Sequence, residues 1–477
     1  MCYRKRLAAI VLFLCFQNLC AEGPTIDVIM KSARTEEKRG NFSKALKLFG
    51  KASNMDPENI RSCIGCARTL CGMDRFQDSI DILQKTMRLR PDKMDAPVEL
   101  AKAHYLNGNV KKSRFIIETL LSCLWDSLDF YAQVEIAERN FEIAKIILES
   151  ILAINPSSKI CRFHLSQCHL AMGDLTRGFE EYESREKSCF DKYCSCKKPE
   201  LRDTNFSGKR VLVFTESGSG NVFNFVRYAR LINERGGKVF VKLHNNKVRN
   251  ILSLCPYINK IIDKDVAPED FDYKIYLMSL PRLFKTTVKN IPSATPYLYA
   301  DKKLEQQWRQ KLSKDKNLKV GICWDGKCFS NDAFVDYMAK KRTFDFENLS
   351  RLADVKGVSF YSLQKFVKEK PSGKLVINNF GKDFDESHGA FMDTAAIMKS
   401  LDLVITIDGP IADLAGGLGV PVWTLLPYES DWKWLENRSD SPWYPNMKLF
   451  RQPKSGDWKS VVEEIRHEID KLARSSK

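Results

Sequence analysis

The sequence lacks several features that would assign it to a class at once. It has no low-complexity tract, no zinc-finger spacing and no RNP-like aromatic strand, so nucleic acid is not an expected partner. Hydrophobic residues make up 44% and charged residues 29% of the chain, as in globular proteins. Its 477 residues are enough for two or three domains of about 100–200 residues each.

Negative charge is in deficit, and the formal net charge is +16. Such a balance favours anionic partners, among them nucleotides, nucleotide-sugars, acidic glycans and membrane surfaces. Charge by itself does not choose among them.

Only one apolar run is long enough to suggest a membrane, and it lies at the N-terminus. Three basic residues, 4–6, precede the apolar run Leu7–Phe16, which is too short to span a bilayer comfortably. Small residues stand just before Glu22. We expect residues 1–21 to be a cleaved signal peptide and the protein to be exported, periplasmic or secreted. The alternatives are an uncleaved N-terminal segment that anchors the protein, and a chance apolar start.

Metal ligands are also in short supply. The chain has 15 cysteines but only 6 histidines, and the CxxC formed by Cys63 and Cys66 has no second pair at zinc-site spacing. We therefore expect no metal. The twelve cysteines outside the leader are an even number, so buried thiols and disulfides both stay open.

A repeat of about 34 residues organises the first part of the chain. Large apolar residues, small residues and prolines each recur in a fixed register. The series are Phe42, Phe76, Val110, Phe141 and Leu175; Ala33, Ala67, Ala101, Ala132 and Ser166; Ala45, Ser79, Ser113, Ala144 and Gly178; and Pro57, Pro91 and Pro156. Two helices cross closely only where the contact residues are small, and each pair covers its open face with the next.

This pattern resembles the tetratricopeptide repeat, with about five repeats over residues 22–192. The resemblance implies an α-solenoid with a concave surface for a protein or peptide partner. A spacer or a dimerisation platform is the structural alternative.

Strand-and-helix alternation begins after residues 193–204, a stretch that breaks the helical pattern and reads as a linker. We expect a first Rossmann-like half at 205–300, a helical connector at 301–318 and a second half at 319–477. In the first half, a buried strand at 211–214 leads to the glycine-rich turn 217–221 and a helix at 222–235.

The stretch 401–427, LDLVITIDGPIADLAGGLGVPVWTLLP, is central to the second half. It predicts a buried strand, a tight turn, a short helix at 411–418 and a second strand. Ligands bind at the carboxyl ends of strands in open α/β sheets, and a helix N-terminus there suits phosphate. A purely structural crossover is the alternative.

Residues from about 205 to 470 are similar to the GT-B domain of glycosyltransferase family 9, the heptosyltransferase-like type. The segments that carry the resemblance occur in the family's order: FTESGSGNVFNFVRYARLI, LMSLPRLFKTTVKNIPSATPYLYAD, VGICWDG, YSLQK, ITIDGPIADLAGGLGVPVWTLLP and SDWKWLENRSDSPWYPNMKLFRQPKSGDW. The resemblance implies a nucleotide-sugar held mainly by the second half, an acceptor facing the first, and transfer without a required metal or cofactor.

The candidate catalytic residues are Glu216 and Asn221. Asn221 stands where the family typically has its aspartate base, and an amide cannot take a proton at neutral pH. Glu216 in the same loop becomes the candidate base, or a ligand for acceptor hydroxyls; a solvated loop residue or a helix cap is the alternative.

The candidate residues for nucleotide-sugar binding follow predicted strands: Trp324, Gln364, Lys365, Asp408, Gly409 and Asp413. The family's turn usually carries a hydroxyl residue and a histidine, where this chain has Gly409 and Asp413. A carboxylate there would repel a diphosphate. Asp408 would hold the turn or contact a hydroxyl group.

The residues thus support two functions. The first is a glycosyltransferase-like protein that moves a sugar from a nucleotide-sugar to an acceptor recruited by the repeats. The second is a catalytically degenerate relative that acts as a protein–protein interaction adaptor.

Overall fold

The structure is a computed structural model that describes residues 24–90, 93, 95–120, 125–185, 198–262, 270–326, 340–343, 346–365 and 374–475. The expected leader at 1–21 and part of the expected linker lie outside these ranges. The chain forms two compact units that divide between His164 and Leu165. Within the described ranges, no helix combines the length and hydropathy that a membrane span needs.

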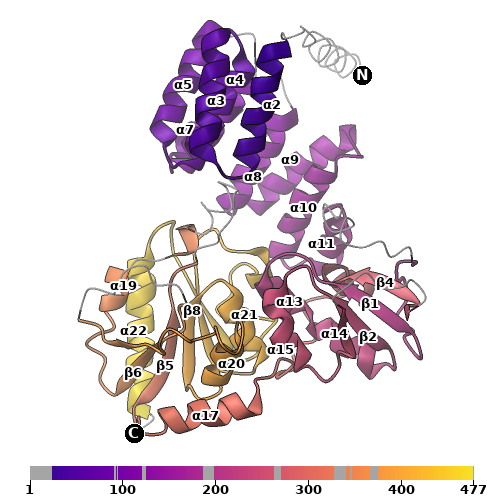
Figure 1. The fold of residues 1–477 in the computed structure, drawn as a ribbon, viewed down its shortest axis with the longest axis vertical. Helices are drawn as coiled ribbons and strands as arrows, with labels where there is room; N and C mark the ends of the chain where they lie inside the picture. Colours follow the sequence, from indigo (N-terminus) through magenta and orange to yellow (C-terminus); the bar gives the residue numbers. More distant parts are fainter. Residues whose placement is uncertain are drawn as a thin grey trace. The chain divides into compact units, whose positions relative to one another are not determined.

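Five helix pairs confirm the tetratricopeptide-like architecture (Figure 1). The second helix of every pair begins at the apolar residue that marks the repeat in the sequence. The pairs are α2 (Pro24–Lys38) with α3 (Phe42–Met55), α4 (Ile60–Gly72) with α5 (Phe76–Leu89), α6 (Asp95–Leu106) with α7 (Val110–Leu120), α8 (Trp125–Ala137) with α9 (Phe141–Ile154), and α10 (Lys159–Ala171) with α11 (Leu175–Tyr182).

The small residues of the repeat lie where the helices cross. Ala33, Ala45, Ala101, Ala132 and Ala144 are completely buried. First helices of neighbouring repeats contact one another, α2 with α4 and α4 with α6. The inner face of the repeat row is therefore formed by first helices.

A four-stranded parallel sheet forms the first half of the second unit, in the order β3-β2-β1-β4. Its strands are β1 (Arg210–Phe214), β2 (Lys238–Lys242), β3 (Lys260–Ile262) and β4 (Tyr273–Tyr276). The helix predicted at 222–235 is instead two helices, α13 (Ser219–Phe225) and α14 (Arg227–Glu234), which meet at Val226. The helix α15 (Arg249–Ser253) follows β2.

A six-stranded parallel sheet forms the second half, in the order β10-β9-β8-β5-β6-β7. Its strands are β5 (Leu318–Cys323), β6 (Val358–Ser362), β7 (Ile377–Asn378), β8 (Leu403–Ile407), β9 (Val422–Leu426) and β10 (Met447–Arg451). Neither β7 nor β10 was predicted from the sequence. The helix α17 (Lys302–Leu312) forms the connector where the sequence predicts one.

Helices cover both faces of this larger sheet. The helices α19 (Phe346–Ser350) and α22 (Trp458–Ser475) flank one face, where Val461, Ile465 and Ile469 pack on strand residues. The helix α21 (Pro410–Gly417) contacts β8 and β9, and α20 (Met392–Met398) lies beside α17 and α21. The α/β part therefore consists of two Rossmann-like halves, as the sequence predicts.

The two halves meet where α13 packs against α21. A Cβ atom on Gly220 would lie 2.6 Å from the Oδ2 atom of Asp413, so only glycine permits this approach. The buried guanidinium of Arg227 lies at the same junction. It donates to the Tyr297 hydroxyl at 2.7 Å and to the Trp443 carbonyl oxygen, and its Cζ atom lies 4.5 Å from the centre of the Tyr444 ring.

Arg227→Met should strongly destabilise the second unit. The substitution leaves buried carbonyl and hydroxyl groups without their donor, a loss of about 3 kcal/mol or more. We expect thermal melting of the full chain to show a drop of several degrees. Arg230→Met, on the exposed face of the same helix, is the matched control and should change the melting temperature little. Equal melting for both variants would contradict the role of Arg227.

Candidate functional site

The predicted site residues lie at the carboxyl ends of parallel strands. Glu216 follows β1, Trp324 follows β5, Gln364 and Lys365 follow β6, and Asp408 follows β8. Asn221 and Asp413 lie in α13 and α21, the two helices in contact. The fold therefore places these residues at the carboxyl ends of the strands, where open α/β proteins bind ligands.

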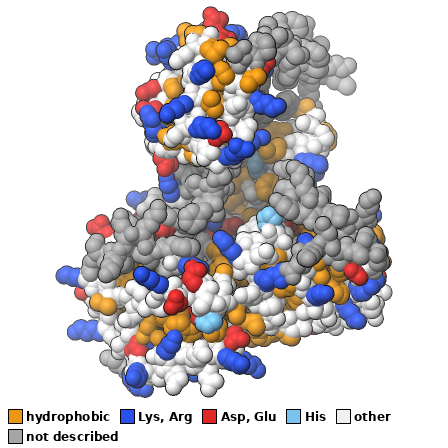
Figure 2. Space-filling view, viewed as in Figure 1, with side chains coloured by type: hydrophobic (Ala, Val, Ile, Leu, Met, Phe, Trp, Pro, Cys, Tyr) orange, Lys and Arg blue, Asp and Glu red, His pale blue; other side chains and the backbone are white. Residues whose placement is uncertain are grey.

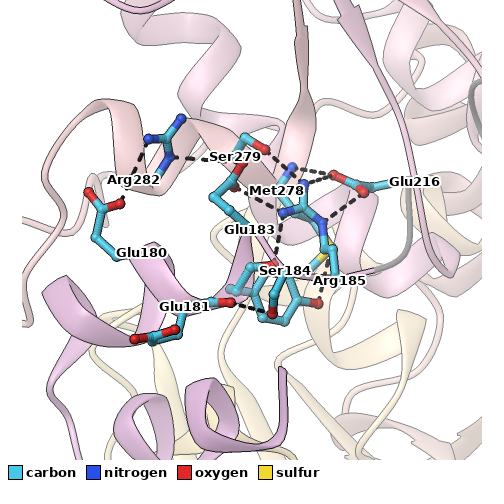
Figure 3. Close-up of polar contacts among 10 residues, drawn as sticks. Glu180, Glu181, Glu183, Ser184, Arg185, Glu216, Met278, Ser279 and Arg282 are labelled. Atoms are coloured by element: carbon cyan, nitrogen blue, oxygen red, sulfur yellow. Dashed lines mark hydrogen bonds and ion pairs between the residues drawn. The ribbon is translucent and has the colours of Figure 1, made fainter. Parts of the chain in front are cut away.

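Glu216 is buried and held by Arg185, which follows α11 of the last repeat (Figure 3). The guanidinium donates from Nε to Glu216 Oε2 at 3.0 Å and from Nη2 to Oε1 at 2.7 Å. The Met278 N–H donates to Oε1 at 3.0 Å, and Nη2 of Arg185 also reaches the Ser279 hydroxyl at 2.8 Å. Burial alone would lower the pKa of Arg185, but hydrogen bonding to Glu216 raises it.

This geometry gives Glu216 a structural task. Both carboxylate oxygens accept charge-assisted hydrogen bonds from Arg185, so a buried ion pair holds the side chain in place. The role of Glu216 as a base stays a prediction, and it would require Arg185 to move. Asn221 donates from Nδ2 to the Ser217 hydroxyl at 2.8 Å and so holds the loop, in which Ser217 has a left-handed backbone with φ of 67°.

Asp413 is completely buried and paired with Lys433. The ammonium donates to Asp413 Oδ2 at 2.9 Å, and the Tyr444 hydroxyl donates to Oδ1 at 2.9 Å. The Lys433 Nζ atom also lies 3.5 Å from Asp408 Oδ1. The negative charge that the sequence placed near a diphosphate is therefore matched by a cation twenty residues further along the chain.

Three carboxylates interact with Lys433, and two of them, Asp408 and Asp413, are buried. Burial raises the pKa of Asp413 to about 6, although Lys433 and Tyr444 act to lower it. Burial would also raise the pKa of Asp408, but Lys433 and Arg342 outweigh it and lower that pKa. Burial raises the pKa of Asp431 as well. The cluster therefore holds Asp408 ionised, while Asp413 titrates near neutral pH.

Gln364 shapes the loop that follows β5. Its Oε1 atom accepts from the N–H groups of Trp324 at 3.3 Å and Asp325 at 3.0 Å, and its Nε2 donates to the Asp325 carbonyl oxygen at 3.2 Å. Trp324 is buried in the core of the second half. Lys365 donates to the Asp385 carbonyl oxygen at 2.9 Å and pairs with Glu386 at 3.1 Å. Their roles in nucleotide-sugar binding stay predictions.

Gly409 has an extended backbone with φ of 171°. Its carbonyl oxygen accepts from the N–H groups of Ala412 at 3.1 Å and Asp413 at 3.4 Å, which starts α21. Pro410 at the first helical position offers no N–H, as its residue type dictates. The start of this helix is consequently a weaker anion site than the sequence motif alone suggests.

Four further polar residues near these strand ends were not predicted from the sequence. Lys341 and Arg342 precede α19, Glu429 follows β9 and Gln452 follows β10. The Lys341 ammonium donates to Glu429 Oε1 at 3.0 Å, and Arg342 Nε lies 3.8 Å from Asp408 Oδ2. The consecutive basic residues were the available signal for the first two, and Gln452 was hidden because β10 was not predicted.

Metal ligands do not gather in groups of three within the described ranges. The cysteines of those ranges are free thiols: Cys63, Cys66, Cys71, Cys161, Cys168, Cys255 and Cys323. On the face shown in Figure 2, Lys and Arg side chains are scattered and do not form one continuous patch.

No family model matches the chain. Protein FlbA of Caulobacter vibrioides is 22% identical over 473 residues, which cover 90% of this chain and 76% of FlbA.

Solved structures resemble each architecture separately. A glycosyl transferase family 9 structure from Veillonella parvula has a TM-score of 0.40 and 12% identity, covering 58% of this chain and 99% of its own. The E. coli ADP-heptose LPS heptosyltransferase II has a TM-score of 0.38 and 11% identity, covering 56% of this chain and 99% of its own. A thermophilic TPR protein of Thermus thermophilus has a TM-score of 0.31 and 14% identity, covering 35% of this chain and 94% of its own.

Arg185 and Glu216 should show strong energetic coupling. Arg185→Met leaves a buried carboxylate without its cation and should lower the free energy of unfolding by about 3–5 kcal/mol. Adding Glu216→Gln removes the unpaired charge, so the double variant should melt above Arg185→Met alone. Arg177→Met, on the exposed side of α11, is the control. Additive losses in a thermal-melting cycle would contradict the coupling.

Asp413 should make the second unit less stable as pH rises from about 4 to about 6.5. Its pKa is raised from 3.8 when unfolded to about 6 when folded, so its stabilising contribution is complete below pH 4 and is lost as pH rises through 6. The full loss is up to roughly 3 kcal/mol.

The measurement is the melting temperature of the wild type and Asp413→Asn from pH 4.5 to 8. The melting temperature of Asp413→Asn should rise relative to that of the wild type as pH rises through this range. Asp470→Asn on α22 removes a carboxylate outside the cluster and serves as control. A constant difference between Asp413→Asn and the wild type would refute the titration.

Proposed function

We propose that this protein transfers a sugar from a nucleotide-sugar to an acceptor that its repeats recruit. The observation that carries the proposal is the contact between two loop regions, each of which lies at the carboxyl ends of the strands of a parallel sheet. The loop after β1 and the turn after β8 meet where Gly220 approaches Asp413. Each edge is of the type that binds a ligand, so a bound nucleotide-sugar and an acceptor would lie next to each other here.

Glycosyl transfer breaks the bond from the sugar carbon C1 to the diphosphate oxygen and forms a bond to an acceptor oxygen. The departing nucleoside diphosphate takes the electron pair, and a base receives the acceptor's proton. Lys341 and Arg342 bring positive charge to the edge at β8 and β9, where it would stabilise the leaving group. The reaction as proposed needs no metal ion.

The acceptor side of the proposal rests on the repeats. Arg34, Arg68 and Lys102 occupy one register position of three successive first helices, and Arg34 and Arg68 are exposed. First helices form the inner face of the row, where Arg68 pairs with Glu37 and Lys102 with Glu99, so this face offers alternating charges to a polar protein segment. The same surface would serve an adaptor that performs no chemistry.

Ligand binding by the purified full chain tests the proposal. We expect at least one of UDP, GDP, ADP and CDP, or one of their sugar conjugates, to raise the melting temperature at millimolar concentration. The corresponding sugar conjugate should then release its nucleotide on incubation with the protein. Inorganic pyrophosphate separates nucleotide recognition from simple attraction of an anion.

Variants test whether the nucleotide binds near the carboxyl ends of β8 and β9. Lys341→Met should reduce the nucleotide-induced shift, while Lys340→Met, an exposed neighbour, should preserve it. Absence of any shift with every nucleotide and conjugate would overturn the enzyme proposal and favour the adaptor.

A further inference from the structure

Glu429 and Gln452 each have one polar atom fixed by the protein and one polar atom left over. Both are more than nine-tenths buried, with exposures of 8% and 3%. Glu429 Oε1 accepts from the Lys341 ammonium at 3.0 Å and the Ser455 hydroxyl at 3.3 Å. Gln452 Oε1 accepts from the N–H groups of Tyr428 at 3.1 Å and Gly456 at 3.2 Å.

The second atom of each side chain, Glu429 Oε2 and Gln452 Nε2, has no hydrogen-bond partner among the described residues. A buried polar atom without a partner is costly, and proteins keep few of them outside functional sites. The fixed first atom orients each side chain and leaves one acceptor oxygen and one donor nitrogen unused by the protein.

The two side chains lie at the carboxyl ends of neighbouring strands. β9 and β10 are parallel neighbours in register, from Val422 beside Met447 to Leu426 beside Arg451. Gln452 follows β10 directly, and its N–H donates to the Leu426 carbonyl oxygen at the end of β9. Glu429 follows β9, and Asp408 follows β8, the next strand along. Asp408, Glu429 and Gln452 therefore follow three neighbouring strands, at the same end of the sheet as the proposed reaction.

The chemistry of these two side chains selects their ligand. The second oxygen of Glu429 would repel a phosphate placed against it, so the diphosphate would lie on the side of Lys341 and Arg342, and an uncharged group would meet Glu429 Oε2. A hydroxyl group both donates and accepts, and can satisfy an acceptor and a donor with a single atom. Neighbouring strands lie about 4.8 Å apart, a spacing that suits several hydroxyls of one ring.

We propose that Glu429 and Gln452 bind hydroxyl groups of the transferred sugar. A hydroxyl donates to Glu429 Oε2 and accepts from Gln452 Nε2. This assignment rests on the proposed function for the identity of the ligand as the sugar of a nucleotide-sugar. It makes the two side chains determinants of sugar specificity, and leaves nucleotide recognition to other residues.

The test compares ligands with and without the sugar on the full chain. Calorimetry measures the affinities of UDP, UDP-glucose, UDP-N-acetylglucosamine, GDP, GDP-mannose and of the three free sugars. Glu429→Gln and Gln452→Met are compared with Glu463→Gln in α22 and Gln310→Met in α17, which make the same changes away from the strand ends. Thermal melting without ligand establishes that each variant folds.

We expect Glu429→Gln and Gln452→Met to weaken the binding of one sugar conjugate about 10-fold or more, and to leave the parent nucleotide within about 2-fold. Both controls should bind as the wild type does. A free sugar that binds in the absence of any nucleotide binding, and is lost in Glu429→Gln, would support the sugar site and overturn the proposed transfer.

Three results would overturn the inference. A sugar conjugate that binds wild type and all variants equally would show that water satisfies the two atoms. Equal losses for nucleotide and conjugate would assign the residues to the nucleotide. Binding of none of these probes would overturn this inference, whereas the proposed function is decided by the wider nucleotide panel of the melting experiment.

Discussion

The α/β unit depends on a buried chain of polar groups that joins its two halves. Lys433 donates to Asp413, Tyr444 donates to the other oxygen of Asp413, and the hydroxyls of Tyr444 and Tyr297 lie 3.4 Å apart. Arg227 donates to Tyr297 at 2.7 Å. Two cations and a carboxylate at low dielectric are tolerable only when every member is satisfied, so the network requires one relative placement of the two halves. The approach of α13 to α21 follows from that placement.

The same network limits what the edge can do chemically. Asp413 and Glu216, two carboxylates that the sequence offers for catalysis or binding, are each neutralised by a buried cation from another segment. A group engaged in this way contributes to stability and to position, and it takes part in proton transfer only if its partner leaves. Glu429 and Gln452 differ from them, because one polar atom of each side chain is engaged by the protein and the other has no partner among the described residues.

Sequence periodicity predicted the fold well because it reports local burial. The residues Phe42, Phe76 and Val110 begin second helices, and 302–312 is a helix, as predicted. Ion pairs were not predictable, because Arg185 and Glu216 lie 31 residues apart in different elements and nothing local links them. Lys433 could not be distinguished from the many other basic residues of the sequence, although it is buried and pairs with Asp413. β10 was missed because its sequence MKLFR alternates with charged residues and is short.

The last repeat shows how the two architectures depend on each other. The compact units divide inside α10, before the linker that the sequence predicts, so α11 belongs with the α/β unit. Phe179 and Tyr182 of α11 pack their rings against Trp432, and Phe179 also contacts Phe225. A repeat array must cover the open face of its terminal repeat, usually with a polar capping helix. Here aromatic residues of the α/β unit cover that face, and Arg185 fixes the end of the array to Glu216. The packing of α11 on residues of its own compact unit accounts for the large buried aromatic side chains of this helix.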